Sequence, residues 1–438
     1  MLKCAFYERE ITPPLGCQLA GYGNLRRATD VKDRLMAKAC VISNGENTVA
    51  FIAIDALRMF YEVKEKITER VSEYTGIPKE NVIVAAVHSH TGIPDYEYNG
   101  DPEAVAEQAH YFDIFPQIIA DCAILAYKRL EDSEMSFGIG EVSGISFCRD
   151  YIMKNGTPQT NPPRCNPDIV GPTSKKDDEL PVIFAKSKDG KPLGAVVTFA
   201  CHLDCVGGTE FSGDFPAELS RQLKAEYGED FVTVFFMGTA GDINHFDVSK
   251  KEDAPDHYIQ MGKKIADEAK RVIESAKPIV GGEIRCKLEF IEIPRREIDE
   301  EAIKRAENVL ATVKEIPGIK IAADGTAADQ YELMMAKRLL NFLKESPLIY
   351  NIPLHFAKIG DVSFYGFPSE IFCHFGLMVK EGCGTEKRMV ASYCNGQYGY
   401  VPTRDLIYDT IYESRPGSSR MCTEAGYMMA EKLIEMGK

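Results

Sequence analysis

The segment Asn81-Val82-Ile83-Val84-Ala85-Ala86-Val87 is apolar after its first residue and runs directly into His88-Ser89-His90-Thr91-Gly92. A continuous apolar run of this length predicts a strand buried on both faces of an α/β sheet. Ligands of such sheets gather where the strands end. His88 and His90 are two residues apart in extended chain and therefore point to the same side, so we expect them to share a site. One metal ion could bind both, or one histidine could bind while the other moves protons. The alternative is a turn cap beside a satisfied core histidine.

Short apolar runs rich in β-branched residues alternate with amphipathic helical patterns along most of the chain, which is typical of an α/β layer fold. The expected strands are Ala37–Ser43, Thr48–Asp55, Asn81–Val87, Met135–Val142, Leu180–Ser187, Leu193–Cys201, Phe231–Met237, Glu283–Pro294, Ile352–Ile359, Val362–Phe367 and Arg388–Tyr393. The expected helices are Val63–Thr75, Ala104–Leu130, Ala217–Tyr227, His257–Ser275, Glu300–Val313, Ala328–Lys344, Ile371–Lys380 and Thr423–Met436. We expect one large α/β domain over residues 1–438, with a mixed β-sheet core layered with helices.

Composition narrows the kind of partner. The 51 Lys and Arg residues against 66 Asp and Glu residues give a net charge of -15, which works against binding nucleic acid or an anionic membrane surface. No run approaches the ~18 to 20 apolar residues of a membrane span, and the charged segment from Met1 to Arg9 does not resemble a signal peptide. We therefore expect a cytoplasmic protein with a small-molecule substrate, and an oligomer is compatible with the sequence. Thirteen cysteines without a CxxC pair argue against a disulfide framework.

Two long irregular segments and one pair of helical patterns stand out. The segment from Cys148 to Glu179 is rich in proline and has little periodicity, so we expect it to form an ordered wall of a site. A similar segment from Gly396 to Met421 carries several tyrosines. The two helical patterns within residues 298–346 carry no recognisable chemistry, and we expect an antiparallel hairpin insertion that serves as a lid or an oligomer contact.

A second buried run, Leu193–Cys201, ends in His202 and repeats the arrangement at His88. Asp214 follows in the next loop, immediately before a helix, where an N-terminal cap is its simplest role. A third apolar run leads into the small-residue turn Gly238-Thr239-Ala240-Gly241-Asp242, followed by Ile243 and Asn244. Such a turn suits an oxyanion or a metal-bound water. The alternative is a tight turn in which Asp242 bonds its own backbone.

Two more strand ends present polar side chains. Glu370 follows the run Val362–Phe367 and is expected in the first turn of a helix, where the helix dipole favours a carboxylate in any case. The run Arg388–Tyr393 passes into a turn that carries Tyr398 and Tyr400. Five strand ends thus each present a His, Asp, Glu or Tyr. Two neutral histidines and one carboxylate would make a catalytic zinc site with a position left open for water.

The set of motifs resembles the N-terminal catalytic domain of the neutral/alkaline ceramidase family. The motifs that carry the resemblance occur in the family's order and cover the chain from about residue 10 to residue 415. They are Ile11-Thr12-Pro13-Pro14-Leu15-Gly16, Val87-His88-Ser89-His90-Thr91-Gly92, Arg149, Ala200-Cys201-His202, Ser212-Gly213-Asp214, Ala240-Gly241-Asp242-Ile243-Asn244, Phe367-Pro368-Ser369-Glu370, and Asn395-Gly396-Gln397-Tyr398-Gly399-Tyr400 with Tyr412-Glu413.

The resemblance implies a zinc (Zn2+) enzyme. In that family one zinc ion is bound by two histidines, a glutamate and a tyrosine, and the matching residues here are His88, His202, Glu370 and Tyr400. The family's second histidine assists the metal-bound water, and an arginine and a second tyrosine contact the amide oxygen. The matching residues are His90, Arg149 and Tyr412. Asp214, Asp242 and Asn244 are candidates to support these groups from behind.

The chain also departs from the family pattern. Full ceramidases carry a secretion signal or surface anchor and a C-terminal immunoglobulin-like domain, and we expect neither here. Where the family has His-Thr-His-Ser-Gly-Pro-Gly, this chain has His88-Ser89-His90-Thr91-Gly92-Ile93-Pro94-Asp95, so the wall beside the metal differs. The family's serine-bearing loop near the substrate amide is not found.

We therefore expect a zinc-dependent amidohydrolase that cleaves an N-acyl bond in a ceramide-like or other amide substrate through metal-activated water. One alternative is a metal-dependent hydrolase of a soluble ester, lactone or sugar-derived metabolite. The other is a relative that binds a ligand without turnover.

Overall fold

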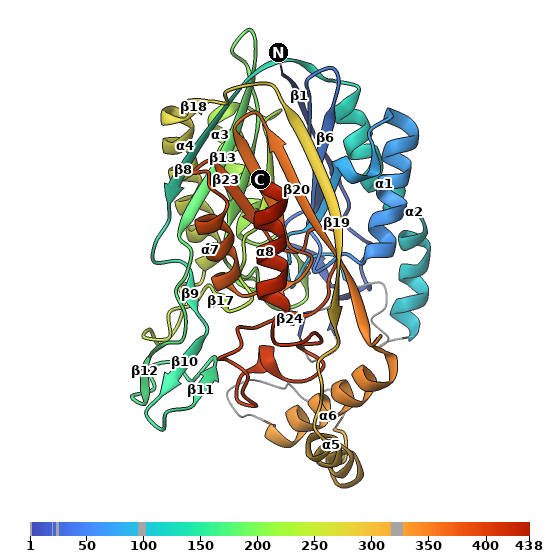
Figure 1. The fold of residues 1–438 in the computed structure, drawn as a ribbon, viewed down its shortest axis with the longest axis vertical. Coiled ribbons are helices and arrows are strands. Elements are labelled where there is room, and N and C mark those ends of the chain that lie inside the picture. The colour runs from blue at the N-terminus through green and yellow to red at the C-terminus, as the bar shows by residue number, and fades with distance from the viewer. Residues whose placement is uncertain (1, 20, 23–25, 95–101, 317–326) are drawn as a thin grey trace.

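The computed structural model describes residues 2–19, 21–22, 26–94, 102–316 and 327–438, and it shows two β-sheets layered with helices (Figure 1). The strands of the larger sheet lie in the order β16-β14-β13-β8-β1-β5-β6-β7, with β18 beside β8. Their bounds are β1 Lys3–Glu10, β5 Met36–Ser43, β6 Thr48–Ile54, β7 Val82–Ala86, β8 Glu131–Glu141, β13 Glu179–Ser187, β14 Pro192–Phe199, β16 Val232–Met237 and β18 Lys277–Pro278. The α/β prediction with a mixed sheet is confirmed, because β6 and β7 run parallel, as do β14 and β16, whereas the other pairs are antiparallel.

The strand from which the sequence prediction started is buried along its whole length. Every residue of β7 is buried, and its last residue, Ala86, pairs with Ile54 at the end of β6. The first strand, β1, was not among the predicted strands. Its sequence KCAFYERE mixes charged and apolar residues without strict alternation, yet β1 pairs with β5 along all eight of its residues. Pairing within the sheet therefore outweighs a weak local pattern at this position.

Helices cover the larger sheet in two pairs. The pair α1 (Tyr61–Thr75) and α2 (Pro102–Tyr127) packs together, with α2 against β1 and β5. The pair α3 (Phe215–Tyr227) and α4 (His257–Ser275) packs against β8, β13 and β16. Glycines allow the close approach of α4, because a Cβ atom at Gly138 would lie 2.7 Å from Val272 Cγ1.

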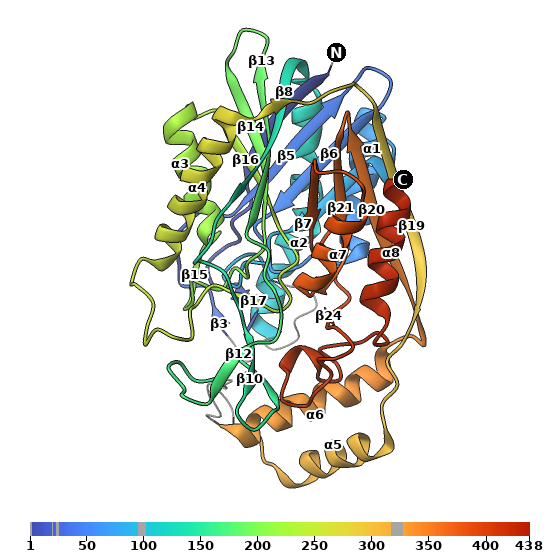
Figure 2. The ribbon, with the colours of Figure 1, turned by 60° about the vertical axis from the view of Figure 1, so that its left-hand side comes forward.

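A second sheet of four strands lies in the order β19-β20-β21-β23 and has its own hydrophobic core. Its strands are β19 Ile284–Pro294, β20 Ile349–Ile359, β21 Val362–Gly366 and β23 Arg388–Ala391, and α7 (Cys373–Gly382) and α8 (Ala425–Gly437) pack against it (Figure 2). Asn395 joins this sheet to the larger one. Its backbone N–H donates to Val84 O at 2.7 Å, and its Oδ1 accepts from Val84 N at 3.0 Å. The strand ends of both sheets therefore meet beside β7.

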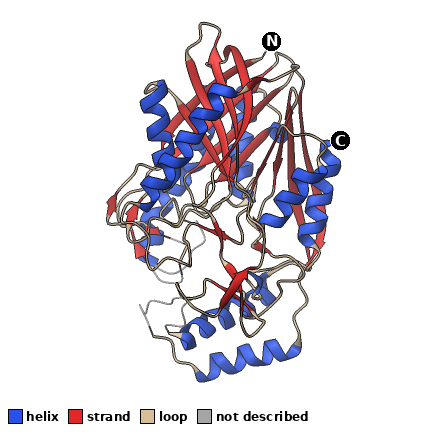
Figure 3. Cartoon of the chain, turned by 90° about the vertical axis from the view of Figure 1, so that its left-hand side faces the viewer, coloured by secondary structure: helices blue, strands red, loops and turns tan. Residues whose placement is uncertain are grey.

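Loops and short strands fill the region below these strand ends, and α5 (Glu300–Thr312) and α6 (Ala328–Glu345) lie beyond them (Figure 3). The two helices pack together through Ala306, Ala336 and Leu339, so both expected helices are present. Residues 317–326 of the expected hairpin, like Asp95 of the expected pocket wall, lie outside the described residues.

Short strands give the loop region regular structure. The segment after Cys148 forms a three-stranded sheet of β10, β11 and β12. The bounds of the short strands are β2 Gln18–Leu19, β3 Arg26–Arg27, β4 Asp30–Val31, β9 Phe147–Cys148, β10 Asp150–Met153, β11 Pro158–Thr160, β12 Ile169–Pro172, β15 Glu210–Phe211, β17 Ile243–Asn244, β22 Glu370–Ile371 and β24 Tyr400–Val401.

Glu370 does not lie in the first turn of a helix, so that prediction is wrong. Glu370 and Ile371 form β22, which pairs with Tyr400 and Val401 of β24, and α7 begins only at Cys373. The carboxylate is therefore fixed in extended backbone opposite Tyr400 rather than at a helix dipole.

Two further expectations concern the chain as a whole. All thirteen cysteines lie among the described residues, and no disulfide bond joins any two of them, as expected. Within the described parts of the chain, every helix is too short or too polar to cross a lipid bilayer.

Candidate metal centre

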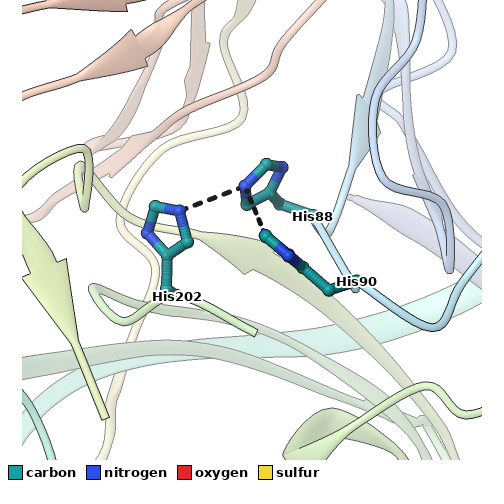
Figure 4. Close-up of side chains that lie close together, drawn as sticks. All are labelled: His88, His90 and His202. Atoms are coloured by element: carbon teal, nitrogen blue, oxygen red, sulfur yellow. Dashed lines mark hydrogen bonds between the residues drawn. The ribbon is translucent and has the colours of Figure 1, made fainter. Parts of the chain in front are cut away.

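Three histidines meet at the strand ends (Figure 4). His88 Nε2 lies 3.2 Å from His202 Nε2 and 3.3 Å from His90 Nε2. His88 and His90 follow β7, whereas His202 follows β14 on the far side of the sheet order. His88 and His202 are buried and His90 is half-buried. The structure therefore brings His88 and His90 together, and His202, which the resemblance matched to a zinc ligand, lies beside them.

The outer ring nitrogens of two of these histidines are held by backbone carbonyls. His88 Nδ1 lies 2.8 Å from Leu57 O, and His202 Nδ1 lies 2.9 Å from Ala240 O. Since a carbonyl only accepts, both Nδ1 atoms carry the proton, and both Nε2 atoms of the neutral rings present lone pairs. Two lone pairs 3.2 Å apart repel each other unless a proton or a metal cation lies between them. A hydrogen bond from the second ring nitrogen to a backbone carbonyl is typical of metal-binding histidines.

Glu370 completes the group of donors. Its Oε2 lies 3.7 Å from His88 Nε2 and 3.9 Å from His202 Nε2. The other oxygen, Oε1, accepts a hydrogen bond from Gln397 Nε2 at 2.9 Å. Oε2 is buried and has no hydrogen-bond partner among the described residues. A buried carboxylate oxygen without a partner is costly, and a metal ion shared with the two imidazoles would satisfy it.

Burial also sets the charge of the histidines. Burial lowers the pKa of His88 and holds the pKa values of His90 and His202 well below the usual range. Repulsion from the Arg149 cation is the second cause at His202, and repulsion between the protonated forms of His88 and His90 is the second cause at His90. The rings are therefore neutral at pH 7, which is the form that binds metal.

The backbone around this group is strained. His88, Tyr393 and Asn395 have φ angles of 74°, 54° and 62°, in the left-handed region that residues other than glycine seldom adopt. Each such residue costs about 1–3 kcal/mol, and strain of this kind gathers at functional sites. Because of this turn, His88 is not in the extended chain assumed from the sequence, although its ring still meets that of His90.

Arg149 reaches the group from the loop after β9. Its Nη1 lies 3.5 Å from His202 Nε2, and its Nε forms an ion pair with Glu413. Thr160 Oγ1 contacts both Asp150 Oδ1, at 2.6 Å, and Glu413 Oε2, at 2.8 Å. Arg149, Asp150 and Glu413 are all buried, so the guanidinium is fixed beside the histidines by a buried polar network.

Tyr412 lies on the same side of the group. Its ring centroid is 5.7 Å from that of Tyr400, and its hydroxyl accepts a hydrogen bond from Arg338 Nη1 at 2.9 Å. Arg338 also donates to Ser418 Oγ at 3.0 Å. Helix α6 therefore contributes Arg338 to the surroundings of Tyr412. No local pattern marks this contact, because Arg338 lies in a helical segment rich in charged residues.

Comparison with known proteins places the chain in a family. The family described as neutral/alkaline non-lysosomal ceramidase, N-terminal, matches residues 8–245, which is more than half of the chain. The chain belongs to this family. The matched region includes His88, His90, Arg149 and His202, whereas Glu370, Tyr400 and Tyr412 lie beyond it. Membership in the ceramidase family supports an amide hydrolase.

Solved ceramidase structures share the fold. The neutral ceramidase from Pseudomonas aeruginosa is 18% identical with a TM-score of 0.73, and a ceramidase complexed with C2 is 19% identical with a TM-score of 0.74. Each comparison covers 100% of this chain and 74% of the solved chain. A search of curated proteins finds no match.

In this ceramidase-family chain, two tyrosines lie near Glu370. Tyr400 pairs with Glu370 between β22 and β24, and its ring centroid is 5.2 Å from Arg149 Cζ. Tyr393 is closer to the histidines, since its hydroxyl lies 3.2 Å from His88 Nε2 and its ring stacks on His88. Burial, then the charge of Glu370, raises the pKa of Tyr393 well above its usual range. Tyr393 was not a predicted site residue, although its place just after β23 was the same signal that marked the others.

The three candidate supporting residues make different contacts. Asp214 is the N-cap of α3 and accepts from Phe215 N at 2.7 Å, so its structural role is confirmed. The Asp242 carboxylate accepts from Cys373 N at 2.7 Å and Ser174 Oγ at 2.6 Å, and its carbonyl accepts from Arg149 N at 2.9 Å. Asn244 Oδ1 accepts from His245 N at 2.7 Å. Of these three, Asp242 is the residue that connects directly to Arg149.

Proposed function

We propose that the chain is a zinc-dependent amidohydrolase that cleaves an N-acyl bond in a ceramide-like or related amide. The observation that carries this proposal is the buried Glu370 Oε2, without a hydrogen-bond partner among the described residues, facing the Nε2 atoms of His88 and His202. Membership in the ceramidase family supports the amide bond as the one cleaved.

The residues present fit a zinc ion. His88, His202 and Glu370 would hold it, with Tyr400 as the fourth ligand, and two imidazoles with one carboxylate are a set of donors that catalytic zinc uses. Zinc bound there would polarise the scissile carbonyl and make water a nucleophile near neutral pH.

The other residues would act on the substrate. His90 is neutral, and its Nδ1 is buried without a hydrogen-bond partner among the described residues, so it can accept a proton and deliver it to the leaving amine. Arg149 and Tyr412 would donate hydrogen bonds to the oxygen of the amide as negative charge develops on it. Each such donor is worth about 3–4 kcal/mol in comparable sites.

Metal analysis of protein purified without chelator tests the ligands. Wild-type protein is expected to contain zinc, and a His88→Ala/His202→Ala double variant is expected to lose one equivalent of it. His110→Ala changes an exposed histidine on α2 and is the matched control, with zinc content as in the wild type. Unchanged zinc content in the folded double variant would refute the ligand assignment.

A substrate panel tests the bond. N-acyl amides with short and long acyl chains, including ceramides, are compared with esters, lactones and glycosides of similar size. We expect hydrolysis of amides by the wild type and its loss in the double variant. Hydrolysis confined to esters, lactones or glycosides would contradict the amide assignment while leaving the metal assignment in place.

A further inference from the structure

A second group of metal-binding side chains lies outside the proposed active site. Cys205, His245 and His257 each present a ligand atom, and the three atoms lie within 4.8 Å of one another. Cys205 is in the loop after β14, His245 follows β17, and His257 is the first residue of α4. The proposed hydrolysis uses none of the three.

The ring nitrogens of both histidines are arranged as in a metal site. His257 Nε2 lies 3.1 Å from the carbonyl oxygen of His245, and His245 Nε2 lies 3.3 Å from Asp204 Oδ1. An oxygen acceptor beside Nε2 favours the tautomer with its proton there, which leaves the Nδ1 lone pair of each ring free for a metal. His245 is 8% exposed, and its Nδ1 is buried without a hydrogen-bond partner among the described residues.

The sulfur donor lies beside α4. Cys205 Sγ lies 3.4 Å from Met261 Sδ, and Met261 is on α4 one turn after His257. Burial, with the nearby carboxylate of Asp214 as the next cause, raises the pKa of the Cys205 thiol well above its usual range. The sulfur is therefore a neutral thiol without metal, and metal binding would release its proton to solvent.

We propose that Cys205, His245 and His257 form a second metal site that takes a thiophilic transition-metal ion, with Zn2+ the best match to one thiolate and two imidazoles. The carboxylate of Asp204 lies behind the His245 ring, where its charge favours a proton on Nε2. The site connects the start of α4 to the two loops that also hold the first site, because Cys205 follows His202 by three residues and His245 follows Ala240 by five.

An ion in the proposed second site would stabilise the neighbouring first site through Tyr22. Tyr22 packs on His90, with ring centroids 5.0 Å apart, and its hydroxyl donates to the Asp204 carbonyl at 3.5 Å. An ion bound to Cys205 would therefore hold the neighbouring residue Asp204 in place. Through Asp204 it would also hold Tyr22 against His90.

Cobalt substitution distinguishes the two sites without an activity assay. Metal-free protein is titrated with Co2+ and followed by absorption, since a thiolate ligand gives a charge-transfer band that the histidine, carboxylate and tyrosine donors of the first site do not give. We expect this band in the wild type and in the His88→Ala/His202→Ala variant. We expect its loss in Cys205→Ser and its retention in Cys165→Ser, because Cys165 is an exposed cysteine outside the group.

Two surface-accessible changes keep the test valid if Cys205→Ser does not fold. His257→Ala alters a half-buried residue at the start of α4 and is expected to lose the band. Asp204→Asn is expected to weaken Co2+ binding at this site by about 10–100-fold, as for other residues behind a metal ligand. Absence of the band in the wild type, or its persistence in folded Cys205→Ser or His257→Ala, would overturn the proposal.

Discussion

The buried network around Arg149 leads to a prediction about how Asp150 and Glu413 share charge. Both carboxyl groups are fully buried, both contact Thr160, and a single guanidinium lies between them and the histidines. Burial raises the pKa of both, the charge of Glu413 raises that of Asp150 further, and the charge of Arg149 opposes the rise at both. We expect the two groups together to carry about one negative charge that balances Arg149.

This shared charge sets the expected loss of unfolding free energy in each variant. In Glu413→Gln, Asp150 takes the charge, so the loss is that of one hydrogen-bonding partner, about 1 kcal/mol of unfolding free energy. Asp150→Asn is expected to cost a similar amount. The double variant leaves Arg149 buried without a counter-charge, which costs about 3–5 kcal/mol. The double variant should therefore exceed the sum of the single variants by about 1–3 kcal/mol.

Urea unfolding followed by far-UV circular dichroism measures the three variants, since the chain has no tryptophan for fluorescence. Glu332→Gln is the control, because Glu332 pairs with Arg415 at the surface and its loss should change stability by less than about 0.5 kcal/mol. Single-variant losses that add to the double-variant loss within about 0.5 kcal/mol would refute charge sharing.

Three further predictions concern α6, a buried histidine and the metal. Arg338→Met should lower kcat/KM on an N-acyl amide by about 10–100-fold, because the charged hydrogen bond to Tyr412 is lost. The control variant Arg305→Met, which changes an exposed arginine of α5, should leave kcat/KM unchanged. Equal activities of the two variants would exclude a role for α6 in the site. Burial, with Lys64 as the next cause, lowers the pKa of His355 to about 3. The neutral ring therefore contributes to the free energy of unfolding, and this contribution is fully present above the unfolded-state pKa of about 6.5. Lowering the pH to 5 should reduce the free energy of unfolding by about 2 kcal/mol. Urea titrations at pH 7 and pH 5 should show a smaller change for His355→Gln, and an equal change would contradict this. Chelation should lower Tm and added Zn2+ should restore it, by an amount that corresponds to about 2.7 kcal/mol at 100 times Kd, and a Tm insensitive to chelation would argue against bound zinc.

The sequence predicted the strand ends because apolar runs and the polar residues that follow them are local features. This logic located His88 and His202 at strand ends, and the resemblance to the ceramidase family added roles for Glu370 and Tyr400. It did not find β1, whose strand character depends on pairing with β5. It also placed Glu370 in a helix, because the pairing of β22 with β24 joins residues thirty positions apart.

Contacts between distant segments explain the other omissions. Arg338 reaches Tyr412 from α6, and Glu413 reaches Arg149 across more than two hundred and fifty residues of chain. No local pattern marks such a pair before the fold brings it together. The second metal site was also not predicted from the sequence. Its residues, Cys205, His245 and His257, come from three separate segments that only the fold brings together.

Anomalous diffraction at the zinc absorption edge, on crystals grown without chelator, tests the central claim most directly. We predict a zinc peak within about 2.0–2.2 Å of His88 Nε2, His202 Nε2 and a carboxylate oxygen of Glu370. A separate peak beside Cys205 would belong to the second site and would not bear on this result. Zinc-replete crystals with no peak among His88, His202 and Glu370 would contradict the account.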